Sequence, residues 1–254
     1  MNKVNINRRQ LLGGAVVGAA GLSGASVARD GELGAPPQTI ERVMFWKEGT
    51  ADAPKVAEGT DYRFFTAAEQ AFIEAAIQRL IPADPTGPSA MEANVHVFLD
   101  RQLGGEFGRG DHYYLGGPWS KGTPEQGYQS RFSPAQLYRA AIPQVEAMVS
   151  KLSSGKSFKQ LSPDDQDAVL KQLEAGKAEL DGVDGKAFFT MLAQNVIEGY
   201  LSDPIYGGNK DMAAWKMIGF PGAHYDYREW VSRHGERVPY PTVSIKGRPG
   251  WREA

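Results

Sequence analysis

Signals that begin α-helices recur along this chain, and each is followed by apolar residues at helical spacing. Thr66 and Glu69 form a capping box, in which each side chain can accept the other residue's backbone N–H. The apolar residues that follow recur three and four positions apart, which places them on one helix face: Phe72, Ile73, Ala76, Ile77 and Leu80. No segment alternates apolar and polar residues convincingly, as a strand does. The sequence therefore predicts an all-α fold, with one irregular helical domain over residues 63–254.

Five further helices are predicted by the same signals. Ser89 with Glu92 makes a second capping box before Val95, Phe98, Leu99 and Leu103. Ser133-Pro134 and Ser162-Pro163 each place proline at a first helical position, where its missing N–H costs nothing. A fifth helix spans Phe189 to Tyr200, and a sixth begins at the cap Asn209 and ends at Gly219. We expect Pro143 to kink or split the helix that begins at Ser133.

Long stretches rich in glycine, proline and aromatic residues separate or follow these helices. We interpret residues 29–62 as an extended N-terminal arm or linker with one apolar patch, Val43 to Trp46. The loop from Gly104 to Arg131 and the tail from Phe220 to Ala254 both contain several tyrosine and tryptophan residues. Such segments stay ordered when they pack on something, and aromatic side chains are enriched at protein interfaces. We therefore expect an extended C-terminal arm and aromatic loops that contact a partner.

The composition excludes several classes of chemistry. The 254 residues include no cysteine, which rules out disulfides, iron–sulfur clusters, covalently attached haem and cysteine nucleophiles. Four histidines leave little material for a histidine-rich metal site. The formal net charge of -2 gives no reason to expect nucleic-acid binding. Dinucleotide-binding, phosphate-loop and nucleophile-elbow motifs are all missing from the sequence, so we expect no catalytic site, cofactor or metal in this chain.

The N-terminus has the features of an export signal. Residues 1–28 contain three basic residues and no acidic one, and Leu11 to Ala28 is an uncharged stretch ending in Ser-Val-Ala. Arg8 and Arg9, followed by Gln-Leu-Leu, resemble the paired arginines of twin-arginine signals. This predicts export to the periplasm by the twin-arginine translocon. A retained transmembrane anchor is the alternative, although the stretch is only about the minimum spanning length and is rich in glycine.

One segment is denser in distinctive residues than the rest of the chain. Residues 203–222, called here the signature segment, contain D-P-I-Y-G-G-N and W-K-M-I-G-F-P-G. Glycine allows close backbone approach, and aromatic residues give binding area with few rotamers to freeze. We interpret the segment as a rigid recognition edge, the alternative being a tight structural helix–loop–helix. The candidate partner-binding residues are Asp203, Tyr206, Gly207, Gly208, Asn209, Trp215 and Phe220.

These two motifs resemble the gluconate 2-dehydrogenase subunit 3 family, the small subunit of membrane-bound flavin-dependent sugar and sugar-acid dehydrogenases. The resemblance implies a complex with a large subunit that holds FAD and a cytochrome c subunit that holds haem. It also implies that the small subunit has no redox centre and supports folding and export of the large one. Related complexes oxidise gluconate, fructose, sorbitol or glucose. The alternatives are a stand-alone exported binding or chaperone module and an independent enzyme.

The twin-arginine interpretation can be tested in the intact cell. Replacing Arg8 and Arg9 together by lysine keeps the charge but removes the arginine pair that the translocon reads. We expect the double variant to remain in the cytoplasm, as measured by fractionation and immunoblotting. A matched Lys3→Arg variant should be exported normally. Export of the double variant at the normal level would contradict the interpretation.

Overall fold

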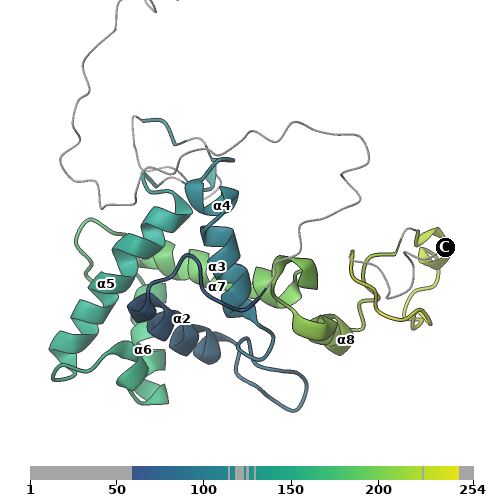
Figure 1. Cartoon of the computed structure of the whole chain (residues 1–254), viewed down its shortest axis with the longest axis horizontal. Helices are drawn as coiled ribbons and strands as arrows, with labels where there is room; N and C mark the ends of the chain where they lie inside the picture. The colour runs from purple at the N-terminus through teal and green to yellow at the C-terminus, as the bar shows by residue number, and fades with distance from the viewer. Residues whose placement is uncertain are drawn as a thin grey trace, which may run out of the picture. The chain divides into compact units, whose positions relative to one another are not determined.

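The computed structural model describes residues 59–113, 115–117, 123, 126–128, 130–224 and 226–245 (Figure 1). These residues all belong to one compact unit. The predicted export signal, including Arg8 and Arg9, lies outside the described residues, as do the Val43–Trp46 patch and Trp251. The predictions that concern them therefore remain predictions.

The described part of the chain is helical and contains no β-strand, which confirms the all-α prediction. Its two isolated β-bridges join Asp84 to Gly87 and Gly222 to Val243. No helix in this part of the chain combines the length and the apolar character needed to cross a bilayer. The α-helices are α2 (Ala67–Leu80), α3 (Val95–Leu103), α4 (Glu106–Arg109), α5 (Pro134–Leu152), α6 (Pro163–Glu174), α7 (Gly185–Leu201) and α8 (Ala213–Ile218). Short 3₁₀ turns are η2 (Phe158–Gln160), η3 (Pro204–Tyr206), η4 (Lys210–Met212) and η5 (Arg228–Trp230).

Local capping sets where most of these helices begin. The capping boxes predicted at Thr66 and at Ser133 both form, with Glu69 and Gln136 as their second members. Ser162 caps α6 through the backbone N–H of Asp165, and Asp184 caps α7 through two backbone N–H groups. These caps satisfy N–H groups that have no partner inside the helix, and each contributes roughly 1 kcal/mol.

The start predicted for α3 was wrong, and one of the two effects predicted for Pro143, a split helix, does not occur. Ser89 and Glu92 do form their reciprocal hydrogen bonds, but they close a turn, and α3 begins only at Val95. The reason is Asn94, whose left-handed backbone (φ 58°) redirects the chain just before the helix. Pro143 does not split α5, which continues through it to Leu152. Buried neighbours on the same helix, such as Ile142 and Val145, keep it packed against the core despite the lost hydrogen bond.

The core forms around α2, which packs against α3, α5, α6 and α7 (Figure 1). The rings of Phe72 and Phe158 lie 4.9 Å apart, and those of Tyr138 and Phe188 lie 5.3 Å apart at a nearly perpendicular angle. Tyr138 is fully buried, and its hydroxyl oxygen accepts a hydrogen bond of 3.0 Å from the Asn195 side-chain amide. Burial raises the pKa of Tyr138, so it stays neutral.

A buried carboxylate fixes the chain where it enters this core. Asp100, on α3, is 1% exposed and accepts backbone N–H groups from Arg63, Phe64 and Phe65 at 2.8, 2.9 and 3.0 Å. Arg101 adds an ion pair of 2.6 Å to the same carboxylate. Three N–H donors and a guanidinium compensate the charge for its loss of water. Asp100 therefore ties the segment before α2 to α3.

We expect Asp100→Asn to destabilise the fold. The substitution keeps the size of the side chain but removes the charge and replaces one acceptor oxygen by a donor that faces N–H groups. The free energy of unfolding should fall by about 2–3 kcal/mol, measured by urea denaturation. Asp111→Asn, which alters an exposed pair with Arg109, should change it by less than about 0.5 kcal/mol. Equal stability of the two variants would contradict the assignment.

Candidate partner-docking site

The signature segment joins the end of α7 to α8 and is held together from within. Asn209 is completely buried; its side-chain N–H donates to the Ser202 carbonyl at 2.9 Å, and its side-chain oxygen accepts the Ala214 backbone N–H at 2.9 Å. The predicted helix start at Asn209 was wrong, because left-handed residues interrupt the backbone and α8 begins only at Ala213, although the Asn209 side chain does bond an N–H of its first turn. The buried amide therefore ties the end of α7 to the start of α8 and makes this part of the segment rigid.

The adjacent glycines Gly207 and Gly208 allow a close approach to α7 of the same chain. A Cβ atom on Gly208 would lie 2.1 Å from the carbonyl oxygen of Gly199, so no larger residue fits without moving the backbone. Gly207 adopts a left-handed conformation with φ 99°. The sequence predicted a close backbone approach at these glycines. The surface that they approach is α7 of the same chain.

The aromatic residues of the segment divide into a buried and an exposed set. Trp215 is 7% exposed, and its indole N–H donates to the Leu201 carbonyl at 2.7 Å. The ring of Phe220 meets it edge-on at 5.0 Å. Phe220 and Tyr206 are 42% and 47% exposed. Trp215 therefore packs inside the subunit, and Tyr206 and Phe220 are the predicted aromatic residues that remain available at the surface.

Asp203, the first residue of the segment, is also buried and faces the C-terminal part of the chain. Its carboxylate accepts hydrogen bonds from the backbone N–H of Ile205, the hydroxyl of Ser244 and the backbone N–H of Ile245. A sequence pattern cannot indicate the last two contacts, because they join residues 41 and 42 positions apart. Of the seven predicted site residues, Asp203, Gly208, Asn209 and Trp215 are buried.

Backbone strain is concentrated in the same loop. Asn209, Asp211 and Met212 all have left-handed backbone conformations, with φ of 44°, 56° and 56°. Such conformations cost free energy in residues other than glycine and persist where surrounding contacts impose them. The backbone N–H of Lys210 reaches the Ala93 carbonyl at 3.1 Å and supplies one such contact. A cavity of about 310 Å³ lies beside the loop, lined by Gly59, Thr60, Asn94, Val97, Pro204, Gly207, Gly208, Lys210 and Asp211.

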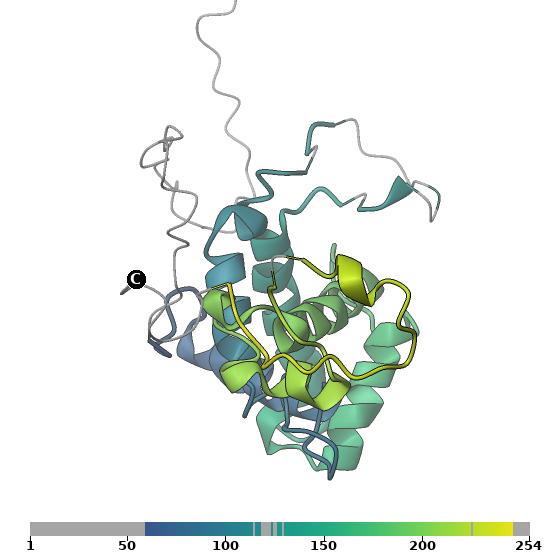
Figure 2. The same ribbon diagram turned by 90° about the vertical axis from the view of Figure 1, so that its right-hand side faces the viewer.

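Most of the exposed large apolar side chains lie in or near the signature segment in the sequence. In the part of the chain that the structure describes, all of them except Leu152 lie between residues 197 and 245. We call the set on the last turns of α7, on η3 and at α8 the α7–α8 face: Ile197, Leu201, Tyr206, Met217, Ile218 and Phe220. Helices α7 and α8 pack together, and α8 faces the viewer in Figure 2. Sequence reasoning missed Ile197, Leu201, Met217 and Ile218, because a helical stripe does not show which apolar positions stay exposed.

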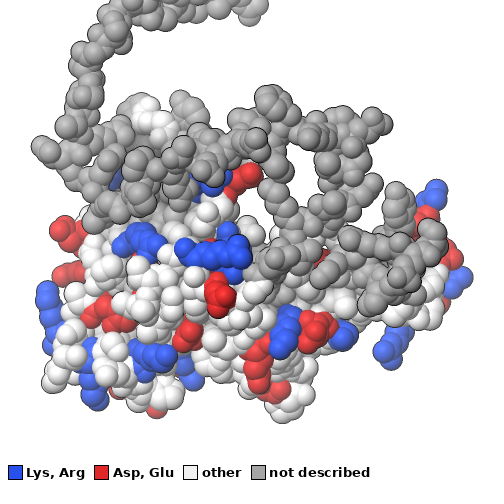
Figure 3. All heavy atoms as spheres, in the orientation of Figure 1, with Lys and Arg blue, Asp and Glu red and all other residues white. Residues whose placement is uncertain are grey.

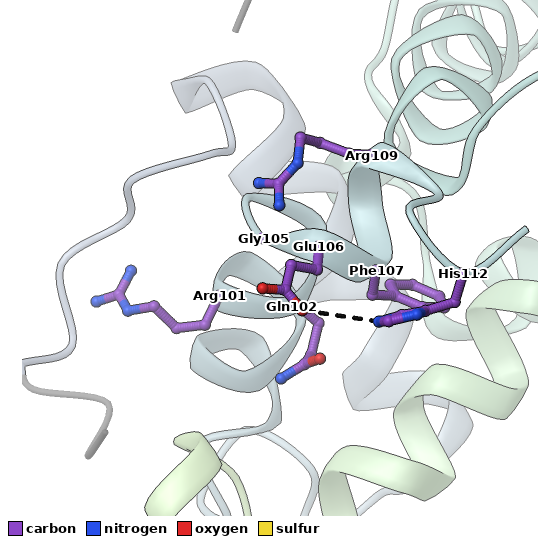
Figure 4. A pocket seen from close by; sticks show the side chains of 7 residues that line it. All are labelled: Arg101, Gln102, Gly105, Glu106, Phe107, Arg109 and His112. Atoms are coloured by element: carbon purple, nitrogen blue, oxygen red, sulfur yellow. Dashed lines mark ion pairs between the residues drawn. The ribbon is translucent and has the colours of Figure 1, made fainter. Parts of the chain in front are cut away.

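A second cavity, of about 430 Å³, lies beside α4 and is lined by polar and charged residues (Figure 4). Its two arginines are already paired: Arg109 bonds Asp111 and Arg101 bonds Asp100, each at 2.6 Å, and the His112 ring lies 3.7 Å from the Glu106 carboxylate. Acidic and basic side chains are interspersed on the face drawn in Figure 3, so its described part has no field of one sign. Among the described residues no group of three His, Asp or Glu side chains is arranged to hold a metal ion.

The four histidines differ in their exposure and in their contacts. His96 packs on the ring of Tyr62 at 5.7 Å, and burial lowers its pKa in spite of the carboxylates of Glu74 and Asp100 nearby. Its Nδ1 atom is buried without a hydrogen-bond partner. Burial and Glu74 raise the pKa of Tyr62. His112 and His234 are exposed, and His224 contacts the Pro241 carbonyl at 3.1 Å.

The fold and this surface define a helical protein whose distinctive residues build a rigid edge beside an exposed apolar face. The family model described as gluconate 2-dehydrogenase subunit 3 matches residues 67–222, which is more than half of the chain. The chain belongs to this family. Comparison with curated proteins and with solved structures gives no significant match. The family is a subunit of a dehydrogenase complex, which gives the chain an accessory role in such a complex.

We expect Gly208→Ala, in the signature segment, to lower the free energy of unfolding more than Gly219→Ala does. The new methyl group at position 208 meets the backbone of Gly199, whereas position 219 has open space and only its left-handed φ of 74° to oppose alanine. The expected losses in the free energy of unfolding are about 3 kcal/mol and about 1 kcal/mol. Denaturation by urea measures both. A loss at position 208 no larger than that at position 219 would contradict the close approach.

Proposed function

We propose that this chain is the non-catalytic small subunit of a periplasmic, membrane-associated flavoprotein dehydrogenase of the gluconate 2-dehydrogenase type. It binds the large subunit, supports its folding and stability, and carries it through the twin-arginine translocon. FAD belongs to the large subunit and haem c to a cytochrome c subunit. Gluconate is the substrate that the family name suggests, and the large subunit determines the choice among gluconate, fructose, sorbitol and glucose.

The observation that carries the proposal is the α7–α8 face. Its six exposed apolar side chains lie within the residues that the family model matches. Burying apolar surface is favourable by about 25 cal/mol per Å², so a protein surface that leaves such residues together in water is a typical binding surface. Tyr206 and Phe220 add aromatic rings, which are frequent anchors in interfaces.

The rigid signature segment supports the same role. Its buried residues fix the backbone before the partner arrives, so little conformational entropy is lost on binding. Trp215 and Asn209 hold the loop, and Tyr206 and Phe220 make the contacts with the large subunit. The buried residues of the two motifs thus fix the backbone, and the exposed residues bind the large subunit.

We expect Ile218→Glu to weaken capture of the large subunit. Ile218 is 57% exposed, so the substitution should leave the thermal midpoint of this subunit nearly unchanged. A charge buried in an apolar interface without a partner costs several kcal/mol, and each 1.4 kcal/mol is tenfold in affinity. Recovery of the large subunit should therefore fall at least about tenfold, measured by affinity purification from the periplasm with mass spectrometry and the FAD absorbance.

Leu152→Glu is the matched control, because Leu152 is 72% exposed on α5 and lies outside the α7–α8 face. Its recovery of the large subunit should equal that of the unaltered chain. If the unaltered chain captures no flavoprotein, the proposal fails, and a stand-alone exported module becomes the better account. If both variants lose the flavoprotein equally, the face is not the docking site.

A further inference from the structure

Residues 223–242, called here the arm, leave the helical domain and return to it at the same place. Gly222 and Val243 form a parallel β-bridge at its base. The backbone N–H of Ala223 donates to the Val243 carbonyl at 2.7 Å, and that of Val243 donates to the Pro221 carbonyl at 3.1 Å. The arm is therefore a closed loop on a fixed base, drawn in yellow in Figures 1 and 2.

Both ends of the signature segment hold this base. The carboxylate of Asp203 accepts the hydroxyl of Ser244 and the backbone N–H of Ile245, each at 2.7 Å. Gly222 has φ 87°, and a Cβ atom there would lie 2.1 Å from the Val243 carbonyl oxygen. Val243 and Ser244 are buried as a result, at 5% and 9% exposed. Asp203 begins the first motif and Gly222 ends the second, and both contact the chain where it returns at residues 243–245. We call these contacts the clasp.

The arm has an aromatic cluster of its own. The ring of Tyr240 lies 5.3 Å from His224 and 6.0 Å from Trp230, and the guanidinium of Arg233 lies 4.9 Å from the centre of the Trp230 ring. The hydroxyl of Tyr240 bonds the carboxylate of Glu229, which raises the tyrosine's pKa. None of the arm's described residues belongs to the core around α2. The arm is ordered by its own contacts and by the clasp.

We propose that the arm is a docking element that binds the large dehydrogenase subunit, an inference that rests on the function proposed above. Most of its described residues are exposed, including Tyr240 at 39% and Val231 at 72%. It follows Met217, Ile218 and Phe220 of the α7–α8 face directly in the sequence. Ordered aromatic side chains on a preformed loop are what tight protein recognition uses, because few rotamers are lost on binding.

The balanced charge of the arm favours a protein surface over anionic lipid or nucleic acid as its partner. Three acidic and three basic side chains balance within residues 223–242. A neutral arm gains no electrostatic attraction to anionic lipid or nucleic acid, which basic segments recognise. Aromatic rings with balanced charges fit an apolar groove edged by polar groups, which a protein subunit can provide. The arm lies beyond residues 67–222, so it is an addition to the part of the chain that the family model matches.

Removing the arm from the full chain tests the proposal. Because the bridge between Gly222 and Val243 is parallel, the chain must cross over to join its two sides, so residues 224–241 are replaced by a Gly/Ser linker of about twelve residues. A second variant, Trp230→Ala with Tyr240→Ala, keeps the backbone, and Glu236→Ala is the matched exposed control on the same arm. Each variant is expressed with the large subunit, and its recovery and thermal midpoint are measured.

We expect the first two variants to recover at least about 10-fold less large subunit at an unchanged midpoint, with normal recovery for Glu236→Ala. Normal recovery by both arm variants would overturn the arm's role and leave the proposed function intact. Failure of the unaltered chain to capture the large subunit would overturn both. Flotation with phosphatidylglycerol vesicles that is lost with the arm would identify a membrane element instead and overturn the proposal.

The clasp has a separate readout. Asp203→Asn keeps the side-chain size but loses the charge that holds Ser244 and Ile245. We expect trypsin to cut the arm at Arg228, Arg233 or Arg237 at least about fivefold faster in this variant, with lower recovery of the large subunit. Unchanged cleavage and unchanged recovery would overturn the role of Asp203 as a positioning residue for the arm.

Discussion

The carboxylate of Asp100 is the interaction on which the helical domain depends. A helical protein without a sheet has no ladder of backbone hydrogen bonds to fix the segments between its helices, yet their buried N–H groups still need partners. Asp100 supplies three of them at the entry to α2. Asn209 and Asp203 serve the same purpose farther along the chain, between α7 and α8 and at the base of the arm. Three buried polar side chains thus set the course of the connections around an apolar core.

The sequence predicted what local interactions determine. The capping boxes at Thr66 and Ser133 form because their partners are three residues away, within reach whatever the tertiary structure. The start of α3 was misplaced because the same local bonds at Ser89 close a turn as readily as a helix. Pro143 does not split α5, because packing on both sides of it outweighs one lost hydrogen bond. Asp100 gave no signal, since its partners lie more than thirty positions away.

The candidate site shows the same division. The motifs indicated where the distinctive surface lies, but not which residues face outward. Trp215 and Asn209 were chosen as contact residues and are buried, whereas Met217 and Ile218, in the same motifs, were not chosen and are exposed. A short helix after a strained loop can present either face, and the hydrogen bond from Trp215 to Leu201 decides between them. The distinctive residues of the motifs therefore predicted which residues hold the loop in place better than which residues are exposed to a partner.

The bridge between Gly222 and Val243 gives the arm unusual freedom to vary. Closing a flexible loop of about twenty residues costs roughly 3 kcal/mol in the length-dependent part of its entropy, and doubling the length adds only about 0.6 kcal/mol. The hydrogen bonds at the base offset this entropy cost, and their contribution does not depend on which residues lie between Gly222 and Val243. Insertions, deletions and exchanges of residues inside the arm should therefore leave the helical domain nearly as stable as before. The domain can keep one scaffold while this single loop changes in length and character.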